Sequence, residues 1–436
     1  MKMDEASQAL LAAARTYAVE HGKEQEGAFR AEEFLRVLEP VFVRAGMRGP
    51  LRRVRQRILI VRDDAAGDFV LFSPVLREVR RLYPAAEIVL LVSPRNGALA
   101  AACPYVDAVS MVRFTYGPGQ FWLAFQQAAE FAADELLQYG FDLAFCPRLG
   151  IRSVSLLLAY FSGAKERVGF TQDRQTPEGV VVPTGWDALL THAAPFPMVK
   201  MHEVDRDLSL LESMIRLPVT DRRLEVWYTP AEAREARERL AVLRTRGFHR
   251  LYAVVPGASI AMKCWPAARY AELLRGILQS EPDVGIVVLG GPGDREAAAE
   301  LAAVFGERAL SFAGEVSFRV SAAMMAECVL YIGNDTGLLH IAAAEELPVL
   351  SVCCFPASLG LQPLSIPVRF APYRVPSVVC QPGEPRNDCR DAWRHGCSRE
   401  REAHCILGVS VELMRRGYVM LRQMVAEGRN VSILLH

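Results

Sequence analysis

Three turns of this sequence combine glycine with carboxylate, hydroxyl or ammonium side chains directly after a run of apolar residues. They are DDAAGD (63–68), PGASIAMKCWP (256–266) and GNDTGLLH (333–340). A carboxylate can act as a general base. A lysine and the free N–H groups of a helix start can bind phosphate oxygens. The three turns therefore predict acid–base chemistry on a substrate that carries a diphosphate.

In the first turn, Gly67 and Asp68 follow the strand-like run RILIVR (57–62) and precede a helical segment at 69–82. Ligands of open parallel sheets bind at the carboxyl ends of the strands, which predicts that the Asp68 carboxylate lies at a ligand site. Aspartate is also a favoured helix N-cap, so capping of the helix at 69–82 is the alternative role.

The second and third turns carry the residues that suit phosphate binding. Ser259 and Lys263 come from the second turn, which lacks the GxxxxGK[ST] spacing of the nucleoside triphosphatases. The candidate binding residues of the third turn are Asp335, Thr336, Gly337 and His340. A fourth turn, GGPGDRE (290–296), offers Asp294 or Glu296 for the hydroxyls of a ribose.

Short apolar strands that alternate with amphipathic helices must position these turns. We expect strands at 57–62, 87–93, 106–112 and 141–147, and a second series at 251–257, 284–294 and 329–335. Such alternation predicts an α/β fold with two doubly wound, Rossmann-like domains that face each other. The expected ranges are a helical N-terminal extension (1–54), an N-terminal domain (55–222), a C-terminal domain (223–408) and a C-terminal helix and tail (409–436). We expect that last helix to pack across the first domain.

Length and charge narrow the class of protein. The 436 residues suffice for two domains, and 50 basic residues balance 50 acidic ones. This balance gives no global field that favours nucleic acid or a membrane surface. No run approaches the roughly 18 apolar residues of a membrane span, and residues 1–26 lack the apolar core of a signal peptide. We expect a cytoplasmic protein with no nucleic-acid partner and at most peripheral membrane association.

Four of the ten cysteines fall within one polar segment that is rich in arginine. They are Cys380, Cys389, Cys397 and Cys405. Such a segment buries too little apolar surface to order itself, and a tetrahedral metal on four thiolates would supply that order. We predict structural zinc or iron at these cysteines, with His395 or His404 as a replacement ligand. Free thiols or redox-sensitive disulfides are the alternative.

Taken in order, the motifs resemble glycosyltransferase family 9, the ADP-heptose heptosyltransferases of bacterial surface glycans. The resemblance rests on residues 57–92, HEVDRDLSLLE (202–212), PGASIAMKCWP and GNDTGLLHIAAA, and it runs from about 57 to 350. It implies a GT-B fold and an inverting transfer without a catalytic divalent metal. By the same resemblance, Asp68, beside Gly67, matches the general base. Lys263 and Ser259 match the residues that hold the diphosphate, and Asp335, Thr336, Gly337 and His340 match further phosphate and sugar contacts.

The N-terminal extension and the four cysteines depart from the ordinary lipopolysaccharide enzymes. A cysteine-bound iron is found in a similar subset, the autotransporter heptosyltransferases, which modify proteins and assemble into rings. The expected partners are therefore ADP-heptose or a similar nucleotide sugar, a lipopolysaccharide-core or protein acceptor, and further copies of the chain in a homo-oligomer. A noncatalytic nucleotide-sugar-binding scaffold or sensor of the same fold is the alternative function.

Overall fold

The computed structural model describes residues 4–21, 31–48, 55–114, 121–148, 154–175, 181–363, 365–386 and 404–436. The chain divides into two compact units. Unit 1 comprises Met1–Ala65, Val75–Pro197 and Asp207–Thr220, and unit 2 comprises Ala66–Pro74, Met198–Arg206 and Asp221–His436. Two short segments, 66–74 and 198–206, thus group with unit 2 although their sequence neighbours belong to unit 1.

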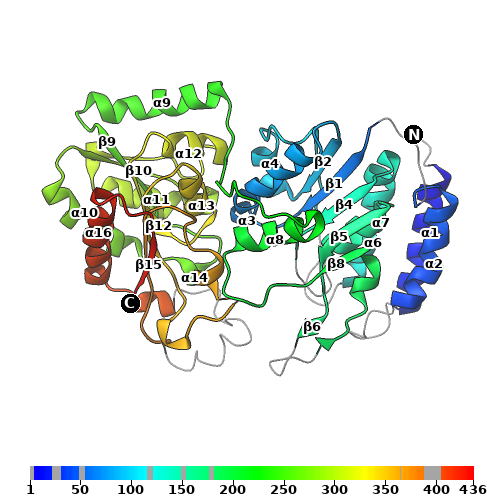
Figure 1. Ribbon diagram of the computed structural model, residues 1–436. Helices are drawn as coiled ribbons and strands as arrows, with labels where there is room; N and C mark the ends of the chain where they lie inside the picture. The colour runs from blue at the N-terminus through cyan, green and yellow to red at the C-terminus, as the bar shows by residue number, and fades with distance from the viewer. Residues whose placement is uncertain are drawn as a thin grey trace. The chain divides into compact units, whose positions relative to one another are not determined.

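Unit 1 is built on a parallel sheet of the order β3-β2-β1-β4-β5-β8 (Figure 1). Its strands are β1 Arg57–Arg62, β2 Glu87–Val92, β3 Ala108–Met111, β4 Leu143–Cys146, β5 Glu166–Phe170 and β8 His192–Ala194, and a separate pair is formed by β6 Arg174–Gln175 and β7 Val181–Val182. Its helices are α1 Glu5–His21, α2 Ala31–Arg44, α4 Ser73–Leu82 (from its third residue onward), α5 Pro94–Ala100, α6 Phe121–Phe131 and α7 Val154–Phe161. The helix α8 Glu203–Ile215 begins in unit 2 and continues in unit 1.

Unit 2 repeats this plan with a seven-stranded sheet of the order β11-β10-β9-β12-β13-β14-β15. Its strands are β9 Arg250–Val255, β10 Val284–Val288, β11 Ala309–Ser311, β12 Leu330–Asn334, β13 Val349–Val352, β14 Ser377–Cys380 and β15 Ser432–Leu435. Its helices are α3 Ala66–Leu71, α9 Pro230–Thr245, α10 Ala267–Ser280, α11 Arg295–Ala303, α12 Phe318–Met325, α13 Gly337–Ala344, α14 Ile366–Arg369 and α16 Val411–Ala426. Both sheets are parallel throughout, which confirms the predicted doubly wound α/β fold.

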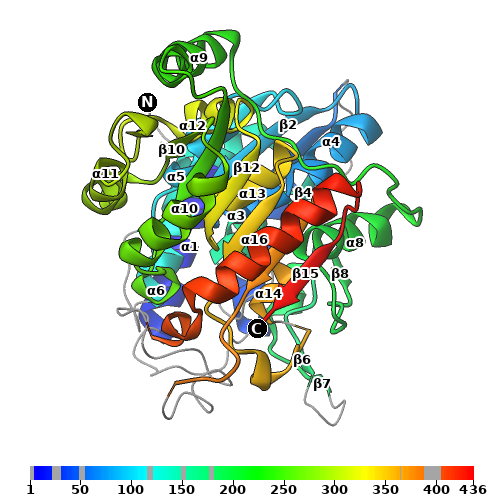
Figure 2. The same ribbon diagram turned by 90° about the vertical axis from the view of Figure 1, so that its left-hand side faces the viewer.

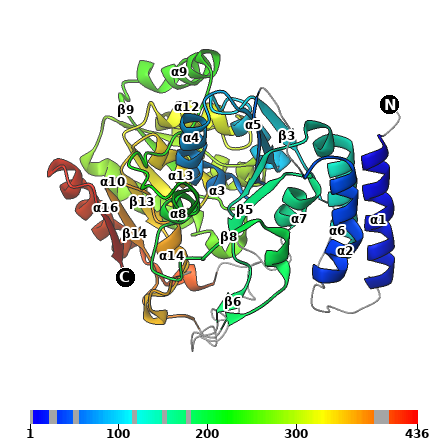
Figure 3. The same ribbon diagram turned by 45° about the vertical axis from the view of Figure 1, so that its right-hand side comes forward.

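The N-terminal extension is helical, as predicted, and it shares the core of unit 1. α1 lies beside α2 and packs against α6 (Figure 3). Tyr17 and Phe34 are fully buried, with ring centroids 5.9 and 5.7 Å from that of Phe125. Burial of each such ring contributes roughly 1.5–3 kcal/mol. Arg48 follows α2 in the chain, and its guanidinium lies 4.2 Å from the ring centroids of both Phe42 and Tyr160.

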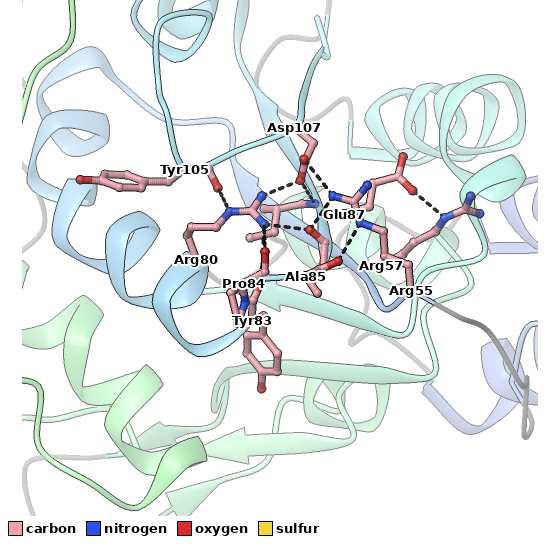
Figure 4. Close-up of polar contacts among 11 residues, drawn as sticks. Arg55, Arg57, Arg80, Tyr83, Pro84, Ala85, Glu87, Tyr105 and Asp107 are labelled. Atoms are coloured by element: carbon pink, nitrogen blue, oxygen red, sulfur yellow. Dashed lines mark hydrogen bonds and ion pairs between the residues drawn. The ribbon is translucent and has the colours of Figure 1, made fainter.

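A polar cluster fixes the amino ends of β1 to β3 in unit 1 (Figure 4). Asp107 accepts hydrogen bonds from Ile88 N (2.8 Å), Arg80 (2.5 Å) and Arg55 (3.0 Å). Burial alone would raise the pKa of Asp107, but these donors and the two guanidinium charges outweigh burial and lower it. Ligands of such folds bind at the carboxyl ends of the strands. The cluster stabilises the other end of the sheet.

The C-terminal helix differs in placement from the prediction. α16 lies beside α10 (Figure 2) and packs on β13 and β14 of unit 2. Its residues Met414 and Leu421 are part of the core of this unit. The expectation that it crosses the first domain is therefore wrong. The strand that follows it, β15, extends the same sheet by pairing with β14. Within the described residues, no helix combines the length and the apolar character that crossing a membrane requires.

The helix expected at 69–82 is two helices, α3 and α4. Pro74 causes the break, because proline has no N–H to donate to Val70 O and its ring clashes with that carbonyl. The Ser73 hydroxyl donates to Val70 O instead, at 2.7 Å, and accepts from Glu225 N at 2.8 Å.

Candidate functional site

The loops after β9 and β12 meet because these two strands are neighbours in the sheet of unit 2. Val255 pairs with Gly333 at their carboxyl ends. β9 is followed in the chain by β10 on one side of it, and β12 by β13 on the other side. The direction of chain progress through the sheet therefore reverses between β9 and β12. Ligands of doubly wound sheets bind at such a switch point. The topology therefore places Lys263, from the first loop, and Asp335, from the second, at one site.

Asn334, the last residue of β12, connects the two loops. Its Oδ1 accepts from Trp265 N (3.1 Å) and from the Tyr270 hydroxyl (2.8 Å). Its Nδ2 donates to Pro256 O (2.6 Å) and also lies 3.4 Å from Gly257 O. The side chain is fully buried, so these contacts replace all of its hydrogen bonds with water. No role was predicted for Asn334 from the sequence, although a polar residue that ends a buried strand is a recognisable signal.

Lys263 and Asp335 form an ion pair, with 2.7 Å between Nζ and Oδ2. Lys263 ends the single turn Ala261–Lys263, and its side chain is 24% exposed against 11% for Asp335. Burial alone would lower the pKa of Lys263, but the charge and hydrogen bond of Asp335 outweigh burial and raise it. Lys263 is therefore cationic at every physiological pH and remains partly accessible to an anionic ligand.

α13 starts immediately after this ion pair. Thr336 is its N-cap and accepts a hydrogen bond from Leu338 N at 3.2 Å. His340 lies one turn further and is buried, which lowers its pKa to about 4 despite the Asp335 carboxylate. The imidazole is thus neutral near pH 7, and its Nδ1 has no hydrogen-bond partner among the described residues. The helix start supplies N–H groups and a neutral imidazole next to the Lys263 ammonium.

α3 packs directly against α13 within unit 2. A methyl group added at Gly67 would lie 2.7 Å from His340 Cδ2 and 3.3 Å from Gly337 Cα, so only glycine allows this approach. Asp68 follows in the first turn of α3 and is half-buried. Because α3 begins at Ala66, Asp68 lies inside the helix, and the alternative that it caps a helix at 69–82 is not supported. Gly67, Gly337 and His340 are brought together, with Asp68 adjacent.

The remaining predicted binding residues lie at the edge of this region. Ser259 is exposed in the loop that leads to Lys263. Glu296 is exposed in the first turn of α11, whereas the half-buried Asp294 faces the end of β9. A methyl group on Gly257 would lie 2.0 Å from Asp294 Cγ. Of the two acidic residues considered for a ribose, Asp294 is therefore nearer to the Lys263 loop.

The cysteine segment is described only at its two ends. Cys380 Sγ lies 3.8 Å from Leu413 O, inside the core between β14 and α16, and burial raises its pKa to about 12. Cys405 Sγ lies 3.4 Å from Nδ1 of His404. Cys389 and Cys397 lie outside the described residues. Among the residues that are described, no group of three or more potential ligands is placed to hold a metal, so the four-cysteine site stays a prediction.

Comparison with known proteins identifies a matching family model. The model of glycosyltransferase family 9 (heptosyltransferase) matches residues 134–358, just over half of the chain. The matched range contains Lys263, Asp335 and His340 but not Asp68. The lipooligosaccharide heptosyltransferase 2 of Haemophilus ducreyi is 23% identical over 302 residues, which are 67% of this chain and 81% of that protein.

Solved structures resemble the chain over most of its length. The glycosyl transferase family 9 protein from Veillonella parvula has a TM-score of 0.62 at 19% identity, covering 84% of this chain and 97% of that one. The ADP-heptose lipopolysaccharide heptosyltransferase II of E. coli has a TM-score of 0.59 at 18% identity, covering 85% and 100%. At these identities the likeness shows the fold alone, and it confirms the GT-B class that the family resemblance implied.

Proposed function

This chain belongs to glycosyltransferase family 9 and is a glycosyltransferase, and from this premise we propose that it transfers heptose from ADP-heptose to an acceptor hydroxyl with inversion at the anomeric carbon. The donor is proposed because the similar E. coli structure is an ADP-heptose heptosyltransferase. We propose a lipopolysaccharide-core glycan as the acceptor, with a protein hydroxyl as the second candidate, and a cytoplasmic site of action.

The observation that carries the proposal is the ion pair of Lys263 and Asp335 at the start of α13. A diphosphate placed there would meet the Lys263 ammonium and the N–H groups of Gly337 and its neighbours. Asp335 is itself anionic, so its proposed role is to hold Lys263 in place and not to contact the phosphates. Proteins use the same combination of cation and amide donors to stabilise developing negative charge on oxygen.

We assign the general base to Asp68. In the proposed step, the Asp68 carboxylate takes the proton of the acceptor hydroxyl while that oxygen attacks the anomeric carbon. The bond from the anomeric carbon to the diphosphate oxygen breaks, and ADP leaves with the added negative charge. The packing of Gly67 against His340 and Gly337 supports this assignment, because it brings the residue before Asp68 to the start of α13.

Lys263 and the N–H groups of α13 would stabilise the leaving group. Their charge and dipoles are already oriented, so little reorganisation is needed as the ADP oxygen gains charge. The neutral His340 cannot add a positive charge near pH 7, which suits it to a hydrogen bond with the sugar or a phosphate oxygen. We expect the reaction to proceed in the presence of a chelator, because this mechanism assigns the leaving-group charge to protein donors.

The test is turnover of a panel of nucleotide sugars by the purified full-length protein. ADP-heptose, ADP-glucose, UDP-glucose and GDP-mannose are each incubated with heptose-deficient lipopolysaccharide and, separately, with a protein extract. The proposal predicts that ADP-heptose alone loses its sugar and that one acceptor gains the mass of a heptosyl residue. Tight binding of ADP without turnover of any donor would instead favour a noncatalytic scaffold.

A further inference from the structure

Residues His202–Arg206, which lead into and begin α8, hold a second segment of unit 2 that is distant in the sequence. We call 202–206 the clamp segment and residues 365–373, which include α14, the clamped segment. Both lie in unit 2. The clamp segment forms the first part of the motif HEVDRDLSLLE (202–212), to which the proposed reaction assigns no role.

The central contact of the clamp is an ion pair between Glu203 and Arg369, which is joined by two hydrogen bonds. Arg369 Nε and one terminal nitrogen each donate to a Glu203 carboxylate oxygen at 2.8 Å. The Glu203 side chain is 11% exposed, and Arg206 Nε lies 3.4 Å from the same carboxylate. Arg206, which is 1% exposed, also donates to Pro363 O at 3.3 Å. Two-pronged pairing of this kind fixes orientation as well as distance.

His202 and Asp205 extend the clamp to the end of the clamped segment. His202 Nε2 lies 2.8 Å from Ala371 O, and Nδ1 accepts from Val204 N at 3.2 Å. Burial lowers the pKa of His202 to about 4, so the ring is neutral, and only the tautomer with Nε2–H makes both bonds. Asp205 accepts from the Tyr373 hydroxyl at 2.8 Å, and the rings of His202 and Tyr373 are 4.6 Å apart.

The clamped segment reaches the candidate site through Phe370. The Arg369 guanidinium lies 4.6 Å from the centroid of the Phe370 ring, and that ring lies 6.3 Å from the imidazole of His340. His340 in turn packs against Gly67, the residue before Asp68. A continuous set of contacts therefore links Glu203 to the imidazole. The proposed reaction gives Glu203, Arg369 and Phe370 no role.

We propose that Glu203 and Arg369 are a positioning pair for glycosyl transfer, which fixes the clamped segment and so holds the His340 imidazole against Gly67. This inference rests on the proposed function for its link to catalysis. The pair acts on the geometry of the reacting centre near Asp68 and not on the Lys263 ion pair that would anchor the diphosphate. Loss of the pair should therefore lower kcat more than it weakens ADP binding.

The experiment compares Arg369→Gln with Arg319→Gln in the full-length protein. Arg319 is a matched control, since it donates to Glu232 at 2.7 and 2.8 Å, is similarly buried, and belongs to the contact of α12 with α9. Arg369→Lys is the milder variant, because lysine keeps the charge but loses the two-pronged geometry. The readouts are hydrogen–deuterium exchange, calorimetric ADP affinity, and kcat with ADP-heptose.

We expect Arg369→Gln to speed amide exchange in 366–373 and in α13 around His340, and to lower kcat roughly 10- to 100-fold, the range for small misplacements of reacting groups. ADP affinity should fall by a smaller factor than kcat, Arg369→Lys should be intermediate, and Arg319→Gln should match the wild type. Unchanged exchange in α13 for Arg369→Gln would overturn the inference. If the wild-type protein transfers no heptose, the proposed function fails, while the exchange data still decide whether the clamp positions His340.

Discussion

Replacement of Asn334 by alanine tests how the two loops of the candidate site are held together. Asn334→Ala removes three hydrogen bonds of 3.1 Å or shorter, to Trp265 N, the Tyr270 hydroxyl and Pro256 O. Each of the three partner groups is then buried without a hydrogen bond, which lowers the free energy of unfolding by about 1–3 kcal/mol per group. Water that enters the new space can satisfy part of this loss. We therefore expect unit 2 to lose about 3–5 kcal/mol of its free energy of unfolding.

The matched control is Asn96→Ala in unit 1. Asn96 is also fully buried, but its Nδ2 makes one bond, to Asp64 O at 2.8 Å. Its replacement should cost only about 1–2 kcal/mol. Urea unfolding followed by exchange mass spectrometry resolves the two units, and calorimetry measures ADP affinity. We expect Asn334→Ala alone to weaken ADP binding, because the Lys263 loop loses its anchor. An unfolding free energy within about 1 kcal/mol of wild type, with unchanged ADP affinity, would refute this reasoning.

Three further predictions concern other parts of the chain. Gly67→Ala should displace His340, lower the free energy of unfolding by about 1–3 kcal/mol and reduce heptosyl transfer. The control is Gly293→Ala, whose new methyl group meets no atom within 4 Å, and it should match the wild type in unfolding and in transfer. The lowered pKa of Asp107 stabilises the folded protein above the pKa that Asp107 has in the unfolded chain, and this stability is lost as the pH falls through the lower folded-state value. Asp107→Asn should therefore flatten the dependence of the unfolding free energy on pH below about 4. An unchanged slope would contradict this prediction. Elemental analysis should find about one zinc or iron per chain, reduced in Cys389→Ser, and a metal content far below one would reject the cysteine site.

The strands and the first residues of the site were predictable because they rest on local signals. Buried parallel strands are continuous apolar runs, as in RILIVR, and each ends in a turn whose glycine and polar residues mark the ligand edge. The two turns then meet because β9 and β12 are neighbours in the sheet, which brings Lys263 and Asp335 within 2.7 Å of each other.

The features that could not be predicted depend on contacts between distant segments. The role of Asn334 depends on partners 64 to 78 residues away, and the clamp on Glu203 and Arg369, which are 166 residues apart. The grouping of Gly67 with His340 in unit 2 likewise follows from packing and not from sequence order. By contrast, the break before α4 had a local cause in Pro74, and that signal was present in the sequence.

The central claim is that Asp68 acts on the acceptor while Lys263 holds the diphosphate. The most direct measurement compares Asp68→Asn and Lys263→Met for heptosyl transfer and for ADP affinity. Asp68→Asn should lower transfer by about 10²- to 10⁴-fold, the usual contribution of a general base, with ADP affinity intact. Lys263→Met should weaken ADP binding itself. If Asp68→Asn transfers heptose at the wild-type rate, Asp68 is not the base and the account is contradicted.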